Sequence, residues 1–315
     1  MTNSQWSSPA EKIHITVPWV NSMKNMAVFI RLARPHQYLK NGFIFLPLFF
    51  SYQLTHWQSL LRVTLSFLVF CLAASSVYVL NDLKDIQDDR LHPVKKNRPL
   101  ASGAILVTDA IYFMMLLALS SLMLALIFPD FSVLMLTAGY IGMNIAYSFS
   151  LKHIPIVDVV TIATGFVLRV FVGGRAAGIP VSHWIVLMTF LLALFLALAK
   201  RRDDLLLAAD GKHLRRSLNG YTMEYVSLSM GVMAAVTIVS YILYTLSPEV
   251  IIKHGTDNLY LTTFWVIVGL LRYLQIALVE KFSGSPTRTL IRDVFLQITI
   301  AGWFAHFVLL LYINR

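Results

Sequence analysis

A run of carboxylates stands between two long apolar stretches of the chain. Positions 82–89 hold four of the sixteen acidic residues. If the preceding helix continues into this run, Asp82, Asp85 and Asp89 stand at i, i+3 and i+7 and project from one face. Such carboxylates repel one another unless a cation lies among them. Hard oxygen ligands without a nearby His or Cys favour Mg²⁺, which leaves positions for substrate phosphate. The run therefore predicts a diphosphate site built on Mg²⁺.

A second charged loop begins with Lys200, Arg201 and Arg202, followed directly by two aspartates. These basic residues are either charges that stop a helix at the membrane surface or ligands for phosphate oxygens. The loop follows the sixth predicted span as the acidic run follows the second. This equivalent position favours the interpretation that the two loops form opposite sides of one site for an anionic substrate.

Other candidates are isolated. Tyr147 and Lys152 lie in a short polar connection, where both residue types are also common as membrane-interface residues. Arg169 and Arg272 lie inside apolar stretches, where a guanidinium costs at least a few kcal/mol and normally faces a polar cavity or a partner. For Arg169, a substrate contact and a structural ion pair are both open, whereas the position of Arg272 near a helix end favours a structural role.

These residues need a membrane-embedded scaffold. The chain has 315 residues, of which 57% are hydrophobic and 13% charged, and this composition indicates an all-α integral membrane protein. Nine apolar stretches are long enough to predict transmembrane helices. They cover residues 38–54, 59–81, 105–127, 131–149, 156–174, 182–199, 224–246, 259–280 and 292–312.

The basic residues predict the orientation. With the N-terminus inside, twenty of the 26 Lys and Arg residues fall on the inner face and four on the outer face. The acidic run is then cytoplasmic, and the net charge of +10 needs no nucleic-acid partner. The first twenty residues do not resemble a signal peptide. We expect a cytoplasmic segment over residues 1–24 and one transmembrane catalytic domain over 25–315.

Several motifs together resemble the UbiA-type superfamily of intramembrane prenyltransferases, and within it the decaprenyl-phosphate phosphoribosyltransferase branch. The similarity extends from about residue 25 onward. The motifs are Asn81-Asp82-x-x-Asp85-x-x-x-Asp89, Arg34-Pro35-x-Gln37-Tyr38-x-Lys40-Asn41, Asn97-Arg98-Pro99-Leu100-Ala101-Ser102-Gly103, Tyr147-Ser148-x-x-Leu151-Lys152 and Lys200-Arg201-Arg202-x-x-Leu205. Typical members carry a second Asp-x-x-x-Asp motif after span six. Here Asp203 and Asp204 lack that spacing and follow basic residues, which favours phosphoribosyl over prenyl transfer.

The resemblance implies a nine-helix UbiA-like bundle in the bacterial cytoplasmic membrane. The implied reaction is Mg²⁺-dependent transfer of 5-phosphoribosyl from phosphoribosyl diphosphate to a polyprenyl phosphate such as decaprenyl phosphate, with release of diphosphate, for cell-wall arabinan precursors. The implied catalytic residues are Asp82, Asp85, Lys152 and Lys200, the metal ligands Asp82, Asp85 and Asp89, and the substrate-binding residues Lys40, Asn81, Arg98, Tyr147, Arg169 and Arg201. A homo-oligomer is left open.

Two other functions compete with this one. An ordinary prenyltransferase would move a prenyl chain from its diphosphate to an aromatic or other small acceptor, and it would share the acidic motif. A transporter also places charges near membrane spans. The acidic run, however, lies in an interfacial loop and not at the midplane of broken helices, which disfavours a transporter.

Overall fold

The computed structural model describes residues 18–92, 94–209, 220–280 and 286–310, and every regular element in these ranges is helical. The helices of the long apolar segments are α3 (Trp57–Lys84), α5 (Val107–Ala125), α6 (Ser132–Phe149), α7 (Val157–Ala177), α8 (His183–Ala209), α9 (Met223–Leu246) and α11 (Thr263–Gln275). The other α-helices are α1 (Pro18–Ala33), α2 (Leu46–Phe50), α4 (Ile86–Leu91), α10 (Pro248–His254), α12 (Pro286–Arg292) and α13 (Val294–Val308). The other elements are the 3₁₀ helices η1 (Pro35–Phe45), η2 (Lys95–Asn97), η3 (Leu151–His153) and η5 (Asn258–Thr262), and the π-helical turn η6 (Ile276–Glu280).

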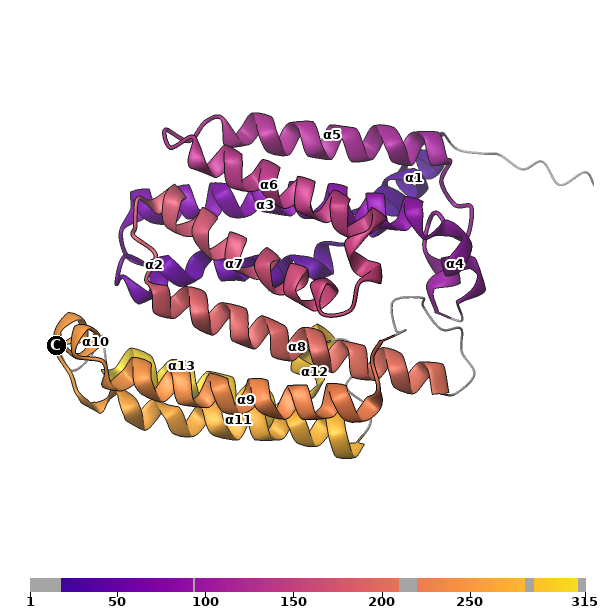
Figure 1. The fold of residues 1–315 in the computed structure, drawn as a ribbon. Helices are drawn as coiled ribbons and strands as arrows, with labels where there is room; N and C mark the ends of the chain where they lie inside the picture. Colours follow the sequence, from indigo (N-terminus) through magenta and orange to yellow (C-terminus); the bar gives the residue numbers. More distant parts are fainter. Residues whose placement is uncertain (1–17, 93, 210–219, 281–285, 311–315) are drawn as a thin grey trace, which may run out of the picture.

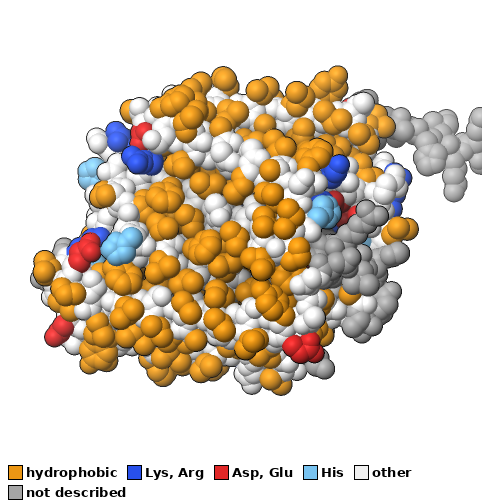
Figure 2. Space-filling model, viewed as in Figure 1, with side chains coloured by type: hydrophobic (Ala, Val, Ile, Leu, Met, Phe, Trp, Pro, Cys, Tyr) orange, Lys and Arg blue, Asp and Glu red, His pale blue; other side chains and the backbone are white. Residues whose placement is uncertain are grey.

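Seven helices of the described ranges are long and apolar enough to cross a bilayer. Six are α3, α5, α6, α7, α8 and α9, and the seventh joins η5, α11 and η6 into Asn258–Glu280. Hydrophobic side chains cover most of the visible face of the molecule, and charged side chains gather towards its two ends (Figure 2). The chain is therefore an integral membrane protein. Most of the predicted N-terminal segment 1–24 lies outside the described residues.

The described residues do not confirm the predicted count of nine spans. The stretch expected at 38–54 consists of η1 and the five-residue helix α2, and the stretch at 292–312 contains the 15-residue helix α13. A straight transmembrane α-helix needs about 20 residues. Hydropathy records how many apolar residues a stretch contains, but it does not record how the backbone winds. Pro35 begins η1 before this stretch, and Pro47 lies at the start of α2, where the winding changes from 3₁₀ to α.

The 3₁₀ helix η1 is held inside the bundle by a close backbone contact with α7. A Cβ atom placed on Gly173 would lie 1.9 Å from the carbonyl oxygen of Ile44, so only glycine permits this approach. Asn41 and Ile44, both in η1, are buried. Irregular backbone is tolerated at membrane depth when protein surrounds it. The contact thus places the polar residues of the first predicted span inside the protein.

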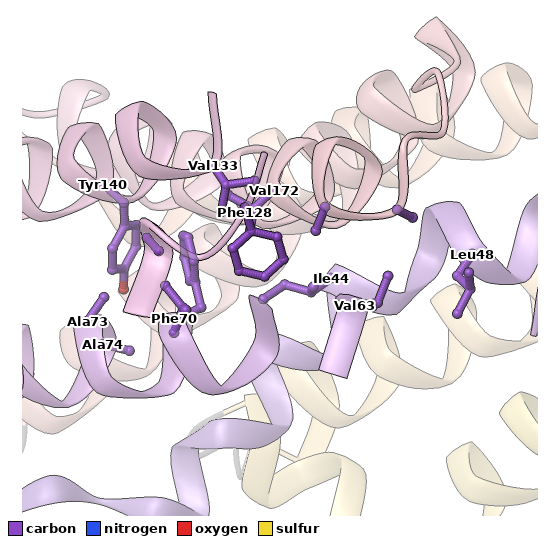
Figure 3. Close-up of a cluster of buried hydrophobic side chains, with 14 of the residues drawn as sticks. Ile44, Leu48, Val63, Phe70, Ala73, Ala74, Phe128, Val133, Tyr140 and Val172 are labelled. Carbon is purple, nitrogen blue, oxygen red and sulfur yellow. The ribbon is translucent and has the colours of Figure 1, made fainter. Parts of the chain in front are cut away.

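The helices form two groups (Figure 1), and each group packs around a main apolar core. The first lies among η1, α2, α3, α6 and α7, and the second among α8, α9, α11 and α13 with part of α7. Figure 3 shows the first core, in which Phe70 of α3 packs on Tyr140 of α6 with ring centroids 4.6 Å apart. Helix α8 contacts both α7 and α9 and joins the two groups.

Helices α3, α6 and α8 all end on the side of the bundle where α4 lies (Figure 1). We call this side the polar end and define it by residues 82–104, 147–158, 200–204 and 220–222. The acidic run, the short connection after α6 and the basic triplet on α8 are therefore at the same end of the molecule, as the sequence predicts.

We expect Gly173→Ala to destabilise the fold, because the new methyl group would push η1 away from α7. Overpacking of this kind costs about 1–3 kcal/mol. The matched control is Gly142→Ala on α6, where a Cβ would meet no atom within 4 Å. The control should leave the free energy of unfolding unchanged or raise it by up to about 1 kcal/mol. Both values can be measured by denaturant titration in detergent micelles. Equal stability of the two variants would contradict the close contact.

Candidate functional site

The acidic run is nearly helical but is interrupted at Asp85. Helix α3 ends at Lys84, and α4 begins at Ile86. Backbone hydrogen bonds from Asp85 to Asn81 (3.0 Å) and from Asp89 to Asp85 (2.8 Å) keep the helical direction across the junction. Asp82 and Asp89 are both 2% exposed, whereas Asp85 is only half-buried. Asp82 and Asp89 therefore lie on one face, as the spacing predicts. Asp85 binds a different partner, Lys152.

Two arginines bind the buried carboxylates. Arg98 NH1 lies 3.1 Å from Asp82 Oδ1 and 2.5 Å from Asp89 Oδ2, so it bridges the two side chains. Arg34 also donates a hydrogen bond to Asp82 Oδ1. Arg34 has a left-handed backbone (φ 56°) and immediately precedes Pro35 at the start of η1. This conformation is uncommon for a residue with a Cβ. It directs the chain from α1 into η1 beside the acidic run.

The short connection after α6 contributes the next contacts. Lys152 Nζ, in η3, lies 2.7 Å from Asp85 Oδ1. Ser148 donates a hydrogen bond of 2.5 Å to the side-chain oxygen of Asn81. Both bonds join residues 67 positions apart in the sequence. The connection between α6 and α7 is thereby held against the end of α3.

The carboxylates offer an oxygen that fits a hard cation. Asp82 Oδ2 is buried and accepts no hydrogen bond from any described residue. An ionised oxygen in this situation is costly to bury unless a cation or a proton reaches it. Among the described residues, no three His, Cys, Asp or Glu side chains converge into a complete protein cage. A partial set of carboxylates is nevertheless what Mg²⁺ uses when water and substrate phosphate complete its shell.

A second cluster surrounds Arg201 on α8, which is 2% exposed. Its Nε lies 2.5 Å from Asp158 Oδ2, and its NH1 lies 2.9 Å from Asp204 Oδ2. Its NH2 donates to the Tyr147 hydroxyl at 3.3 Å. Because Tyr147 and Ser148 are adjacent at the end of α6, one turn of helix touches both clusters.

The carboxylate of Asp158 has two further partners at the start of α7. Tyr221 donates a hydrogen bond of 2.6 Å to Asp158 Oδ1, and the backbone N–H of Val159 donates to the same oxygen at 2.8 Å. Burial, and next the hydrogen bond to Asp158, raise the pKa of the Tyr221 phenol above its ordinary value. The phenol therefore remains protonated and acts as a donor.

Two further cations predicted to bind substrate, Lys40 and Lys200, lie outside these ion pairs. Lys40 in η1 lies close enough to Lys200, Arg169 and Arg34 to be repelled by each of them, and its ammonium donates no hydrogen bond to a described residue. Lys200 is exposed on α8 beside Arg201. These three neighbours make the surroundings of Lys40 strongly positive.

Arg169 lies in α7 and is buried. Its guanidinium donates to the side-chain oxygen of Asn41 (2.8 Å), to the carbonyl of Gly165 (2.7 Å) and to the hydroxyl of Tyr140 (3.1 Å). It also lies over the ring of Phe70, with 5.3 Å to the centroid. These neutral partners hold Arg169 between η1, α3 and α6. The substrate contact predicted for it stays a prediction.

Comparison with known proteins decides the family. The model of the UbiA prenyltransferase family matches residues 43–298, more than half of the sequence. The chain belongs to the UbiA prenyltransferase family. It is 31% identical to the decaprenyl-phosphate phosphoribosyltransferase of Corynebacterium glutamicum over 300 residues, which cover 92% of this chain and 89% of that protein. The enzyme of the same name from Mycolicibacterium smegmatis is 31% identical over 299 residues, covering 91% and 93%.

A solved structure gives the same fold. The UbiA homolog from Archaeoglobus fulgidus bound to GPP and Mg²⁺ has a TM-score of 0.67 and 22% identity, covering 88% of this chain and 98% of that one. Together with the relatives above, the family makes this chain a transferase. The resemblance found in the sequence motifs is confirmed.

Two arginines of this UbiA family member lie outside the two clusters. Arg202, for which the sequence left a charge at the membrane surface and a phosphate ligand both open, is 6% exposed and donates to Ser227 at 3.2 Å and to the carbonyl of Ala277. Ala277 lies in the π-helical turn η6, where the helical hydrogen-bond pattern changes. The Arg202 side chain is therefore buried and bound to the protein. Arg272 forms ion pairs with Asp293 (2.6 Å) and Glu280 (2.8 Å), which confirms its structural role.

The sequence did not point to Asp158 or Tyr221, and it gave Arg34 no role beyond its place in a family motif. An aspartate inside the apolar stretch 156–174 was a usable signal, because a buried carboxylate needs a partner. Tyr221 gave no signal, since tyrosine is common at membrane borders. Only the fold brings it to Asp158.

We expect Arg202→Ala to lower the free energy of unfolding by about 1–3 kcal/mol, because the Ala277 carbonyl would lose a charged donor. Turnover per folded molecule should stay near that of the parent enzyme, because Arg202 faces α9 and η6. Arg202→Lys is the control, since it keeps a charge that can reach part of the same site. An Arg202→Ala protein with parental stability would show that these hydrogen bonds do not matter.

Proposed function

We propose that the chain transfers a 5-phosphoribosyl group from phosphoribosyl diphosphate to a polyprenyl phosphate and releases diphosphate. The names of the two bacterial relatives support this substrate pair. The structural observation that carries the proposal is the pairing of carboxylates with Arg34, Arg98 and Lys152 at the polar end. Such a site has partners both for a metal ion and for the phosphate groups that the metal accompanies.

In the proposed site, the cations that pair with the acidic run would exchange their carboxylate partners for phosphate oxygens when the donor and the metal bind. A metal ion on Asp82 Oδ2 would draw negative charge away from this carboxylate, and Oδ1 would then interact less strongly with Arg34 and Arg98. Arg34 and Arg98 would then turn towards the diphosphate oxygens, which a planar guanidinium can hold in a bidentate manner. Lys152 would make the same change from Asp85 to a phosphate oxygen.

Magnesium is the metal that this donor set fits best. Asp82, Asp85 and Asp89 would hold it with support from Asn81. Asp82 Oδ2 is an oxygen that lacks a donor among the described residues. When bound, Mg²⁺ neutralises charge on the leaving diphosphate. Carboxylates and amide oxygens without His or Cys distinguish such a site from a zinc site.

The proposed transfer needs charge neutralisation and orientation more than proton transfer. The bond between C1 of the ribose and the diphosphate oxygen breaks and C1 gains oxocarbenium character. An oxygen of the acceptor phosphate then forms the new bond from the opposite face. The acceptor is already an anion, so it needs no strong general base. Lys152, Lys200 and Arg201 would bring the two anionic substrates together, and Lys40 and Arg169 would extend the positive region.

The membrane setting belongs to the same proposal. In this proposal the polar end and the N-terminus lie on the cytoplasmic side of a bacterial inner membrane, which the distribution of basic residues supports. A water-soluble phosphorylated donor would enter from the cytoplasm. The isoprenoid chain of the acceptor would remain in the lipid, beside the apolar surface of the bundle. The product would then supply arabinan precursors for the cell wall, and assembly into a homo-oligomer is compatible with this arrangement.

Prenyl transfer from a polyprenyl diphosphate to an aromatic or other small acceptor is the second candidate. It is supported by the family itself and by the acidic motif. Arg201 disfavours it, because this buried cation occupies the charged segment of helix α8 next to Asp204.

A double-label assay separates the two reactions. Purified protein in lipid nanodiscs receives Mg²⁺, polyprenyl phosphate and phosphoribosyl diphosphate with a ¹⁴C-labelled ribose, and a parallel sample receives a ³H-labelled prenyl diphosphate with a small aromatic acceptor. We expect ¹⁴C to enter the organic phase only when polyprenyl phosphate is present. Transfer of ³H without transfer of ¹⁴C would support the prenyltransferase instead.

The metal assignment predicts that Asp82→Asn lowers turnover by about 10²-fold or more, roughly 3 kcal/mol in the barrier, with little loss of folded protein. Asp85→Asn should behave similarly. Asp88→Asn is the matched control, because Asp88 belongs to the same run but is exposed. EDTA should abolish activity, and added Mg²⁺ should restore it. Parental turnover of Asp82→Asn at saturating Mg²⁺ would remove Asp82 from the metal site.

A further inference from the structure

The connection between η3 and α7 contains a strained turn. Ile156 has φ 71° and ψ −50°, and the N–H of Val157 donates to the carbonyl of Pro155 at 2.8 Å. These values describe a γ-turn with a positive φ, a rare conformation, and a β-branched side chain makes it more unfavourable. Strain of this kind costs about 1–3 kcal/mol and persists only where the surrounding structure enforces it.

Tyr221 is the residue that holds the turn. Its hydroxyl accepts a hydrogen bond of 2.7 Å from the N–H of Ile156 and donates one of 2.6 Å to Asp158 Oδ1. One oxygen atom therefore connects the strained peptide to the first turn of α7. Tyr221 is itself buried.

The neighbouring Gly220 closes the other side of this contact. Gly220 has φ +118°, and a Cβ placed on it would lie 2.6 Å from Cγ of Pro155. A larger residue would clash with the proline ring. The segment Gly220–Tyr221 therefore packs tightly on Pro155 and Ile156 and fixes the position of the Tyr221 hydroxyl.

The turn lies between two residues that form ion pairs in the candidate site. Lys152 precedes Ile156 by four residues and binds Asp85, and Asp158 follows Ile156 by two residues and binds Arg201. Asp158 and Arg201 are almost fully buried. A buried ion pair is costly to form and gives little net stability compared with apolar packing. Stability alone therefore explains neither the strained turn at Ile156 nor the buried Asp158–Arg201 pair. Both features lie where they determine the orientation of Arg201.

We propose that Tyr221, through Asp158, is a positioning residue that holds the Arg201 guanidinium and the Lys152 connection in the geometry required for transfer. This inference rests on the proposed function, because it assigns Arg201 and Lys152 to the substrate phosphates. Tyr221 and Asp158 touch neither substrate. They keep Arg201 pointed towards Tyr147 and Asp204.

The test compares Tyr221→Phe with Tyr225→Phe. The first variant removes only the bridging oxygen, and the second removes an exposed hydroxyl that makes no hydrogen bond with a described residue, on a ring 6.1 Å from that of Tyr221. Turnover is measured per folded molecule, with the donor Michaelis constant determined separately. We expect Tyr221→Phe to lower kcat about ten- to a hundredfold, the range for small misplacement of groups that orient substrates, with the Michaelis constant within about twofold. Tyr225→Phe should match the parent enzyme.

A double variant shows whether Tyr221 acts through Arg201. In the Arg201→Lys background, Tyr221→Phe should cause less than about a twofold further loss, because residues that act as one unit are not additive. A full further ten- to hundredfold loss would overturn the proposal, and so would a Tyr221→Phe enzyme with parental kcat. If Tyr221→Phe folds poorly, Ile156→Gly is added to all variants, since glycine adopts the turn without strain.

The parent enzyme separates this proposal from the proposed function. If it transfers no labelled ribose phosphate to any polyprenyl phosphate, the proposed function fails. If it transfers label and Tyr221→Phe does so equally well, only the positioning role fails.

Discussion

Burial of charge inside a membrane protein is the constraint on which this structure depends. An ionised side chain removed from water is tolerated only when a counter-charge and hydrogen bonds surround it. Arg201 meets this condition through Asp158, Asp204 and Tyr147, and Asp82 meets it in part through Arg34 and Arg98. Asp204 lies on the same helix as Arg201, but Asp158 and Tyr147 come from other parts of the chain, as does Arg34 beside Asp82. The charges therefore determine how the ends of the helices are placed against one another.

Several unusual backbone features follow from this constraint. Arg34 adopts a left-handed conformation where the chain turns towards Asp82, and Ile156 adopts a strained turn where the chain enters α7. The 3₁₀ helix η1 brings Lys40 and Asn41 into the bundle, and Gly173 allows η1 to approach α7 closely enough. A regular α-helix at each of these points would carry the polar side chains elsewhere. Ideal helices form the scaffold, and the departures from them lie close to the charged side chains.

Much of the architecture and part of the site could be predicted from the sequence. The long apolar stretches gave seven of the expected spans, because hydropathy and length suffice for a regular helix. Asp82 and Asp89 could be placed together from helical spacing, and Lys152 and Arg201 from their positions just after predicted spans, although α8 continues to Ala209. The 3₁₀ winding of η1 could not be predicted, since it depends on packing against α7. The pairing of Asp158 with Arg201 and Tyr221 joins residues 43 and 63 positions apart, and no local pattern encodes it.

The central claim is that the acidic run and the cations beside it form one site for a phosphorylated donor and its metal ion. The most direct measurement is an experimental structure of the protein with phosphoribosyl diphosphate and Mg²⁺ in lipid nanodiscs. The account predicts a metal ion about 2.1 Å from Asp82 Oδ2, the distance typical of Mg²⁺ and oxygen, with Arg98 or Lys152 on the diphosphate. Donor density away from the polar end, with Arg98 still bridging Asp82 and Asp89, would contradict it.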